Sequence, residues 1–177
     1  RVLDGAVAVF SRTPATGQLT YMETHKDSSL GGSAAGLLGA STLTLSADGS
    51  DLYVASFTSD AVAHFRRDTV VASPTYGALT FQGAVVDNAL GVNGLDGAAF
   101  VRLSPNGNHL YVASAVEKAI AVFSRDGGTG ALTFVAAPDF EAPAAAGADN
   151  VYDVTIQVSD GAGRADKQAI AVTVTNA

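Results

Sequence analysis

The chain has no cysteine and no tryptophan, one methionine, three lysines and three glutamates. Without cysteine, disulfide scaffolds, thiolate metal sites and cysteine nucleophiles are excluded. Glutamate, lysine and methionine favour helix surfaces, so their scarcity argues against a helical protein. Fourteen aspartates and 19 glycines instead favour turns. Between the turns, Val, Thr, Phe and Tyr recur in short alternating runs, a pattern that predicts β-strands throughout.

Positive charge is also scarce, with 10 Lys and Arg against 17 Asp and Glu and a net charge of -7. An acidic surface repels phosphate backbones and anionic lipids, so we expect no nucleic-acid partner and no membrane insertion. The longest uncharged stretch, residues 28–47, is rich in Gly and Ser and reads as loop and strand rather than a membrane span. Because the chain opens with Arg1, we expect a processed or excised piece of a longer protein.

An internal repeat covers much of the chain. Residues 43–67 align without a gap with residues 101–125, and Leu-Tyr-Val-Ala-Ser is identical in both copies. A partial third copy opens the chain, where residues 6–12 match residues 119–125. A Gly-x-Leu-Thr-(Phe/Tyr) string follows each copy, beginning at Gly17, Gly77 and Gly130. Such self-similarity is typical of repeat architectures.

Each full repeat contains four strand-like runs, and two further runs precede the first repeat. Asp-Gly and Asn-Gly pairs separate the first run from the second and predict hairpin turns. Four antiparallel strands per repeat are typical of a β-propeller blade. The predicted strands are 6–12 and 18–24, then 42–46, 52–56, 61–67 and 78–86, then 98–104, 110–114, 119–125 and 131–137.

The string Leu-Ser-Pro-Asn-Gly-Asn-His-Leu-Tyr-Val-Ala-Ser at residues 103–114, followed by Phe-Ser-Arg and Gly-Ala-Leu-Thr-Phe, resembles lactonase-type and YVTN-like β-propellers. The resemblance covers about residues 1–137 and implies about two and a half propeller-type blades. Propellers close with four to eight blades. We therefore expect assembly with other domains of the same protein or with further copies, as a homo-oligomer.

The remainder, residues 138–177, has a different pattern. Residues 138–150 read as a connection rich in Ala and Pro, and alternating strands follow at 152–160 and 168–176. The run 129–176 resembles the C-terminal half of a bacterial cadherin-like repeat, through Pro-Asp-Phe-Glu, Tyr-x-Val-x-Ile-x-Val-x-Asp-Gly and Ala-x-Thr-Val-x-Asn. This implies a second domain that is part of an immunoglobulin-like sandwich. The fold class expected for the whole chain is all-β.

The cadherin-like resemblance implies a calcium site, because that family holds calcium with carboxylate and carbonyl oxygens between modules. The matching positions are Asp139, Glu141 and Asp160. Calcium is the one cofactor that we expect, and the alternative is that these are ordinary turn carboxylates.

Other candidate residues are weaker. His25, His64 and His109 lie far apart without metal-ligand spacing, and His64 is interpreted as a strand residue facing a blade surface. The acidic loop 87–96 is a candidate ligand or ion site, with a spacer as the alternative. No residue is predicted to be catalytic.

These patterns favour a non-enzymatic structural or adhesion module, secreted or displayed on a bacterial cell surface. One alternative is a fragment of a lactonase-type propeller hydrolase, since the same blades serve as enzymes and as binding platforms. Another is a carbohydrate-binding surface platform.

Overall fold

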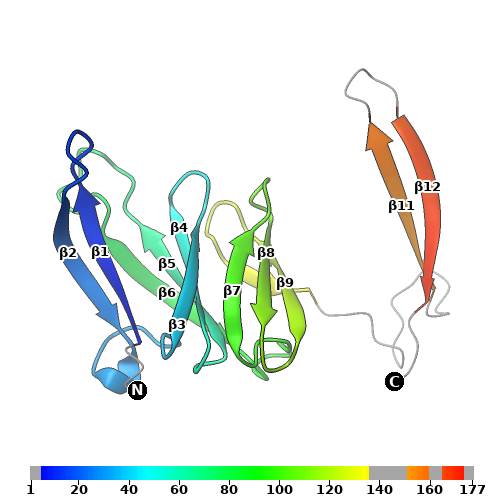
Figure 1. Ribbon diagram of the computed structural model, residues 1–177, viewed down its shortest axis with the longest axis horizontal. Coiled ribbons are helices and arrows are strands. Elements are labelled where there is room, and N and C mark those ends of the chain that lie inside the picture. The colour runs from blue at the N-terminus through cyan, green and yellow to red at the C-terminus, as the bar shows by residue number, and fades with distance from the viewer. Residues whose placement is uncertain (1–4, 136–150, 160–164, 174–177) are drawn as a thin grey trace. The chain divides into compact units, whose positions relative to one another are not determined.

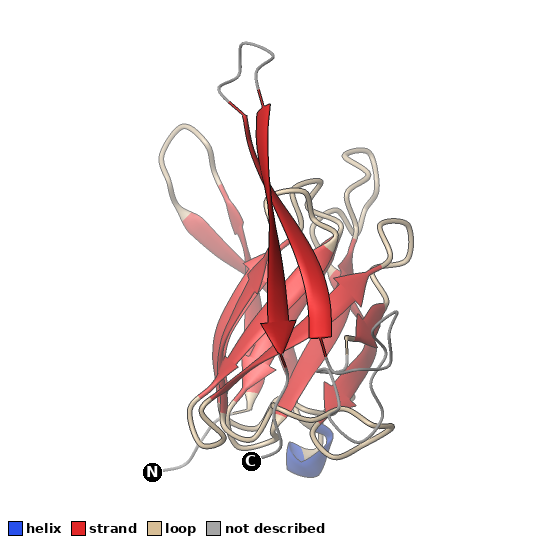
Figure 2. Ribbon diagram, turned by 90° about the vertical axis from the view of Figure 1, so that its right-hand side faces the viewer, coloured by secondary structure: helices blue, strands red, loops and turns tan. Residues whose placement is uncertain are grey.

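The computed structural model describes residues 5–135, 151–159 and 165–173. Backbone contacts divide the chain into two compact units, Arg1–Ala136 and Ala137–Ala177. Strands make up nearly all of the regular structure, and the one helix among the described residues is a 3-10 turn at Ser28–Leu30 (Figure 2). No helix in the described part of the chain is long and apolar enough to cross a membrane.

The first unit begins with a two-stranded hairpin and continues with two four-stranded antiparallel sheets, side by side in Figure 1. The prediction of an all-β fold with four-stranded propeller-type blades is confirmed. The hairpin is β1 (Ala6–Arg12) and β2 (Leu19–Lys26); the first blade is β3 (Ala40–Leu45), β4 (Asp51–Ser56), β5 (Ala61–Arg67) and β6 (Leu79–Val86); the second blade is β7 (Ala98–Leu103), β8 (His109–Ser114), β9 (Ala119–Arg125) and β10 (Leu132–Phe134).

The second unit contains an antiparallel hairpin of β11 (Val151–Ser159) and β12 (Ala165–Thr173). Both strands begin earlier than the alternation of apolar residues predicts, β11 by one residue and β12 by three. The two strands pair over their full length, from Val151 with Thr173 to Ser159 with Ala165. The cadherin-like sandwich is not confirmed by this hairpin and stays a prediction.

Equivalent turns connect the first and second strands of the two blades. Gly49 and Gly107 both have φ of +72°, a value that glycine adopts without strain. In each turn a serine hydroxyl donates to the side chain two residues later, from Ser46 to Asp48 at 2.5 Å and from Ser104 to Asn106 at 2.7 Å. The predicted Asp-Gly and Asn-Gly turns therefore begin the hairpins of both blades.

Two apolar clusters hold the sheets together, one at each interface. Between the blades, Tyr53 and Val62 of the first pack with Leu110 and Phe123 of the second. Between the hairpin and the first blade, Val7 joins a cluster that includes Phe65. Burial of apolar side chains at such interfaces contributes about 1.5–3 kcal/mol for each Val, Leu or Phe. Stacking of successive sheets is thus the main source of the core.

The blades approach closely along their first strands. The hydroxyls of Ser41 and Thr42 on β3 donate to the carbonyl of Ala99 on β7, at 2.8 and 3.1 Å. In return, the Val101 amide donates to the Thr42 hydroxyl at 3.1 Å. These side-chain bonds fix how one sheet stands against the next, along the edge strands β3 and β7.

Candidate functional site

A cleft of about 360 Å³ lies between the first strands of the two blades. Most of its lining residues have apolar side chains, and Thr44, Arg102 and Ser104 are its polar and charged members. No His, Asp or Glu of the described residues lines it. The cleft could bind a ligand, but it lacks a side chain that exchanges protons near neutral pH.

A cluster of charged residues is buried at the outer part of the same interface, around Asp51. The Asp51 carboxylate is fully buried. It receives hydrogen bonds from Arg125 at 2.5 Å, from His64 Nε2 at 2.9 Å and from Arg66 at 3.1 Å. The Ser50 hydroxyl also donates to it, at 2.9 Å. Buried charges require such pairing, so Asp51 and Arg125 join one blade to the next.

The strand register explains how the cluster forms. Asp51 begins β4 and lies opposite Arg66 on β5, while Tyr53 lies opposite His64. Alternation along both strands places all four side chains on the face that receives the second blade. The His64 ring stacks on Tyr53 at a centroid distance of 4.9 Å.

The second blade contributes Arg125, at the end of β9, and Gly130, just before β10. The Tyr53 hydroxyl donates to the Gly130 carbonyl at 2.5 Å and accepts from Arg125 Nε at 2.9 Å. A Cβ at Gly130 would collide with the Asp51 carboxylate and the His64 ring. Glycine is therefore required at this position by the close approach of the two blades.

The cluster shifts the pKa of several of its members. Burial acts to raise the pKa of Asp51, but hydrogen bonds from His64, Arg125 and Ser50 outweigh it and lower the pKa. Burial raises the pKa of Tyr53 to about 12, against the opposing effect of Arg125. At neutral pH the site thus holds an ionised carboxylate and a neutral phenol.

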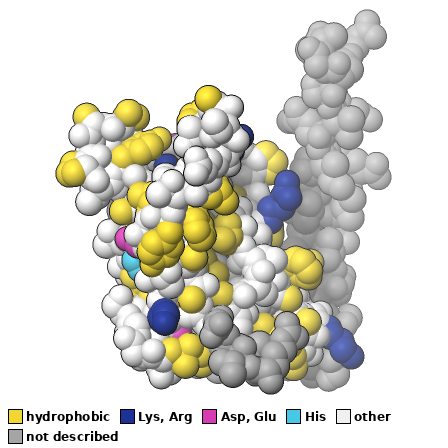
Figure 3. Space-filling model, turned by 60° about the vertical axis from the view of Figure 1, so that its left-hand side comes forward, with side chains coloured by type: hydrophobic (Ala, Val, Ile, Leu, Met, Phe, Trp, Pro, Cys, Tyr) yellow, Lys and Arg dark blue, Asp and Glu magenta, His cyan; other side chains and the backbone are white. Residues whose placement is uncertain are grey.

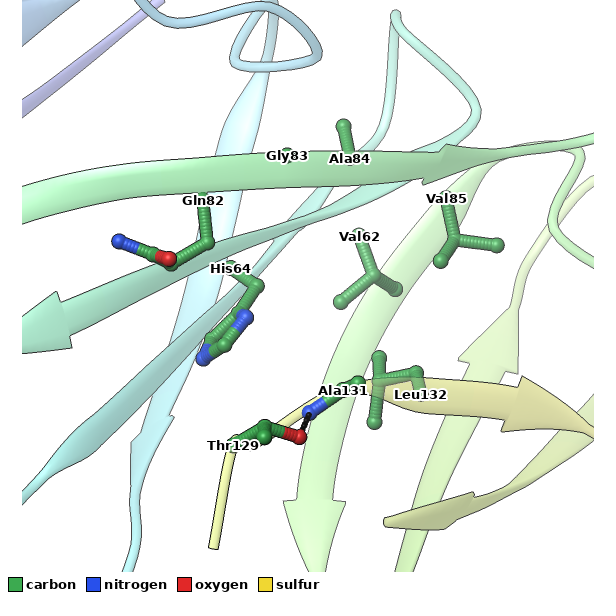
Figure 4. A pocket seen from close by; sticks show the side chains of 9 residues that line it. All are labelled: Val62, His64, Gln82, Gly83, Ala84, Val85, Thr129, Ala131 and Leu132. Atoms are coloured by element: carbon green, nitrogen blue, oxygen red, sulfur yellow. Dashed lines mark hydrogen bonds between the residues drawn. The ribbon is translucent and has the colours of Figure 1, made fainter. Parts of the chain in front are cut away.

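A cavity of about 330 Å³ opens beside the cluster, and His64 lies on its wall (Figure 4). The remaining lining comes from β5, β6 and the segment that leads into β10, including Gln82, Thr129 and Ala131. His64 points from β5 toward the Thr129 segment (Figure 4). The volume lies at the lower end of the range of ligand pockets, about 300–1,000 Å³.

The tautomer of His64 follows from its partner. A carboxylate only accepts hydrogen bonds, so Nε2 carries the proton that it donates to Asp51. In the neutral ring, Nδ1 then carries no proton and can accept one. An Asp–His pair beside a cavity is an arrangement that can activate water.

The candidate site residues predicted from the sequence lie in different parts of the chain, and not all of them are described by the structure. Asp139, Glu141 and Asp160 lie outside the described residues, so the calcium site stays a prediction. His25 accompanies Glu23 at 3.2 Å on β2, and His109 begins β8. Among the described residues, no group of three or more His, Asp and Glu side chains could hold a metal ion.

In the acidic loop 87–96, the first of the two aspartates holds the loop in its fold. The Asp87 carboxylate accepts hydrogen bonds from the Leu95 amide at 2.9 Å and from the Asn88 side chain at 2.7 Å. Asp27 has the same role in the loop between β2 and β3, where its carboxylate accepts a hydrogen bond from the Leu37 amide at 2.7 Å. These carboxylates shape the loops between sheets.

The sequence reasoning missed Asp51, Arg66, Arg125 and Gly130 as members of the cluster that contains His64. The signal that could have found them is a break in the repeat. Asp51, His64 and Arg66 of the first repeat align with His109, Val122 and Ser124 of the second. The two repeats therefore differ at these three positions, although the residues around them match.

No family model matches the sequence, and no curated protein matches it. Solved structures do resemble it. A periplasmic gluconolactonase of Pseudomonas aeruginosa, PpgL, superposes with a TM-score of 0.60 and 26% identity over 76% of this chain and 34% of that chain. A Bacteroides fragilis protein named as a candidate 6-phosphogluconolactonase has a TM-score of 0.57 and 28% identity over 76% and 33% of the chains. A Lactobacillus plantarum protein has a TM-score of 0.58 and 30% identity over 75% and 35% of the chains.

The chain spans about a third of the length of these proteins. They support the resemblance of its blades to lactonase-type propellers, while the cadherin-like segment is not confirmed by them. The expectation of a non-enzymatic structural or adhesion module is wrong. Two of the structures that resemble this chain are named as a gluconolactonase and as a candidate 6-phosphogluconolactonase, which favours the enzymatic alternative. The error arose because blade patterns encode a fold and not an activity.

Proposed function

We propose that this chain is part of a lactone-hydrolysing β-propeller that acts on sugar lactones. The observation that carries the proposal is the likeness of its blades to PpgL and to the Bacteroides fragilis protein, at 26% and 28% identity. Because the chain corresponds to about a third of each, the activity belongs to the polypeptide or assembly in which these blades stand.

The reaction is the opening of a cyclic ester by water. Water attacks the acyl carbon, and its departing proton passes to a base. The resulting oxyanion collapses as the bond between the acyl carbon and the ring oxygen breaks. The ring oxygen takes up a proton, and the product is a hydroxy acid that ionises and releases one proton. A base next to the attacking water and a positive charge near the oxyanion both accelerate this reaction.

His64 is the base that we propose within this chain. Its Nε2 is held by Asp51 at 2.9 Å, which leaves Nδ1 free to accept the proton of a water in the adjoining cavity. Arg66 binds the same carboxylate at 3.1 Å and its side chain is 40% exposed. This guanidinium supplies positive charge next to the Asp51–His64 pair without being buried.

The test is a pH-stat assay with gluconolactone and its 6-phosphate, corrected for spontaneous hydrolysis. It is run on this chain and on a longer polypeptide that carries it. We expect acceleration of lactone opening, and His64→Gln should reduce kcat by about 10²–10⁴-fold. His109→Gln is the matched control, because it changes a histidine in the other repeat that does not line the cavity, and it should leave kcat unchanged.

Two outcomes separate the parts of this proposal. If neither polypeptide accelerates the hydrolysis of any sugar lactone, the lactonase proposal is overturned. If hydrolysis occurs but His64→Gln retains full kcat while remaining folded, the base lies elsewhere and the role of His64 is rejected.

We also propose that the protein works outside the cytoplasm, in the periplasm or beyond the cell. The support is that PpgL is a periplasmic protein. Cell fractionation with an antibody against the chain tests this, and recovery in the cytoplasmic fraction alone would contradict it.

A further inference from the structure

Three equivalent aromatic pairs mark one face of each sheet in the first unit. Phe65 contacts Phe81 with a centroid distance of 5.4 Å, and Phe123 contacts Phe134 at 5.5 Å. Both pairs belong to the apolar clusters between sheets. The third pair joins Phe10 to Tyr21 at 5.9 Å on the β1–β2 hairpin.

This third pair is exposed. Phe10 is 49% exposed and Tyr21 is 59% exposed, whereas Phe123 is fully buried. Leu19 beside them is also exposed. Hydrophobic side chains gather on the side of the molecule that carries this hairpin (Figure 3). We call the surface formed by Phe10, Leu19 and Tyr21 the hairpin face.

A second exposed apolar surface lies on the outer side of the second blade. Phe100, Tyr111 and Ile120 are all exposed there. Phe100 and Ile120 share one face because both pair with Ala113 of β8. Tyr111 lies two residues before Ala113 on β8 and therefore faces the same side. We call these three residues the blade face. In the first blade, Tyr53 and Val62 of the aligned face are fully buried against the second blade.

The covered face shows which residues its partner needs. Tyr53 is held by Arg125 and by the carbonyl of Gly130. Arg125 ends the Phe-Ser-Arg sequence of β9, and Gly130 begins the Gly-x-Leu-Thr-Phe string. The β1–β2 hairpin carries the same two elements, with Arg12 aligned to Arg125 and Gly17 aligned to Gly130.

The geometry of the hairpin also matches. Gly17 and Gly130 both have φ of +73°. Arg12 pairs with Leu19 across the hairpin, as Arg125 pairs with Leu132 across β9 and β10. The hairpin thus presents backbone and side chains aligned with those that cover Tyr53 within the chain, with Tyr21 in place of Phe134. The exposed Tyr111 is the residue aligned with Tyr53.

We propose that the blade face of one copy of this chain binds the hairpin face of a second copy, head to tail. Phe10 and Tyr21 then occupy the place that Phe123 and Phe134 occupy against the first blade. Arg12 and the Gly17 carbonyl bind the Tyr111 hydroxyl. The contact joins two different patches, so it is heterologous and builds rings or open chains.

Sedimentation velocity over a range of concentrations tests the proposal. The wild-type chain should associate, while Ile120→Glu and Phe10→Glu should each remain monomeric, because each places a charge in an apolar contact. Both positions are exposed in the single chain, so the variants should fold, and circular dichroism checks this. Val71→Glu, an exposed position on a loop outside both faces, is the control and should associate like the wild type.

The decisive sample is an equimolar mixture of the two variants. The Ile120→Glu chain keeps an intact hairpin face and the Phe10→Glu chain keeps an intact blade face, so the mixture should form dimers and stop there. Tyr111→Phe should weaken wild-type association by about 5- to 30-fold, because the hydroxyl loses its bonds to Arg12 and to the Gly17 carbonyl.

Three outcomes would overturn the proposal: a wild-type chain that stays monomeric, a mixture that forms no dimer, or a Phe10→Glu variant that still dimerises by itself. The first would mean that another partner, such as a further blade of a longer polypeptide, covers the blade face. The experiment does not depend on the proposed lactonase activity, so the two proposals fail separately.

Discussion

The two full blades share a sequence pattern but differ in their surroundings. The first blade packs against the hairpin on one face and against the second blade on the other, whereas within the first unit the second blade has one packed face. Leu-Tyr-Val-Ala-Ser is identical in both, yet Tyr53 is fully buried and Tyr111 is 42% exposed. Local sequence therefore sets the strand, and the neighbouring sheet decides the burial.

The polar residues of the two blades also differ according to whether a second sheet covers them. Asp51, His64 and Arg66 occupy the covered face of the first blade, and His109, Val122 and Ser124 occupy the aligned positions of the second. Charge is thus concentrated where a second sheet supplies Arg125 to balance it. The comparison predicts that equal substitutions at aligned positions have unequal effects.

The largest expected effect is that of Asp51→Ala. The change leaves the Arg125 guanidinium, which is 6% exposed, buried without its carboxylate, and we expect a loss of about 3–5 kcal/mol in the free energy of unfolding. His109→Ala, at the aligned position, should change it by no more than about 0.5 kcal/mol. Urea denaturation followed by circular dichroism measures both. Equal losses would show that the cluster does not hold the blades together.

Gly130→Ala should have the next largest effect, with Gly17→Ala as its matched control. Both glycines have φ of +73°, so both substitutions share a backbone cost of about 1 kcal/mol. At Gly130 the new methyl group also collides with Asp51 and His64, whereas at Gly17 the nearest atom is the end of Arg12 at 3.5 Å. We expect Gly130→Ala to cost about 1–3 kcal/mol more in thermal unfolding. If the two variants unfold alike, the interface has more room than the structure shows.

Tyr53→Phe tests the contact across the blades with a smaller change. The variant leaves the Gly130 carbonyl without its donor and Arg125 without one acceptor, so we expect a loss of about 1–2 kcal/mol. In dilute solution, Tyr111→Phe should stay within about 0.5 kcal/mol of the wild type. The measurement is again urea denaturation, at a concentration where the chain is monomeric. A similar loss at both positions would contradict the asymmetry between the blades.

The strands could be predicted from the sequence because their information is local. Residues 61–67 and 119–125 are runs that begin with apolar residues and lie between turn signals, and β5 and β9 have these bounds in the structure. The Asp51 cluster could not be predicted in this way, since Arg125 lies 74 residues from Asp51 and reaches it through the stacking of two sheets. Function was harder still, and the predicted adhesion role was wrong because blades of one pattern serve many activities.

The turns between the first and second strands offer the mildest contrast, which depends on pH. Hydrogen bonds from the Ser46 hydroxyl and from Ser50 lower the pKa of Asp48 to about 2. In the second blade, Asn106 accepts equivalent bonds from Ser104 and from the Asn108 amide at 2.7 and 3.1 Å and cannot titrate in this range. The folded pKa of Asp48 lies below its ordinary value of 3.8, so its contribution to stability is complete above pH 3.8 and is lost as the pH falls through about 2.

An NMR titration from pH 5 to pH 1.5 makes this difference visible. The amide of Ser50, which donates to Asp48 at 3.1 Å, should shift with a midpoint near 2, while the amide of Asn108 should stay nearly constant. Asp48→Asn should abolish the Ser50 transition and make the first turn behave like the second. A midpoint near 4 would mean that the carboxylate is solvated and the turn is held by its backbone alone. The two blades would then differ in the sheets that cover them and not in how their hairpins begin.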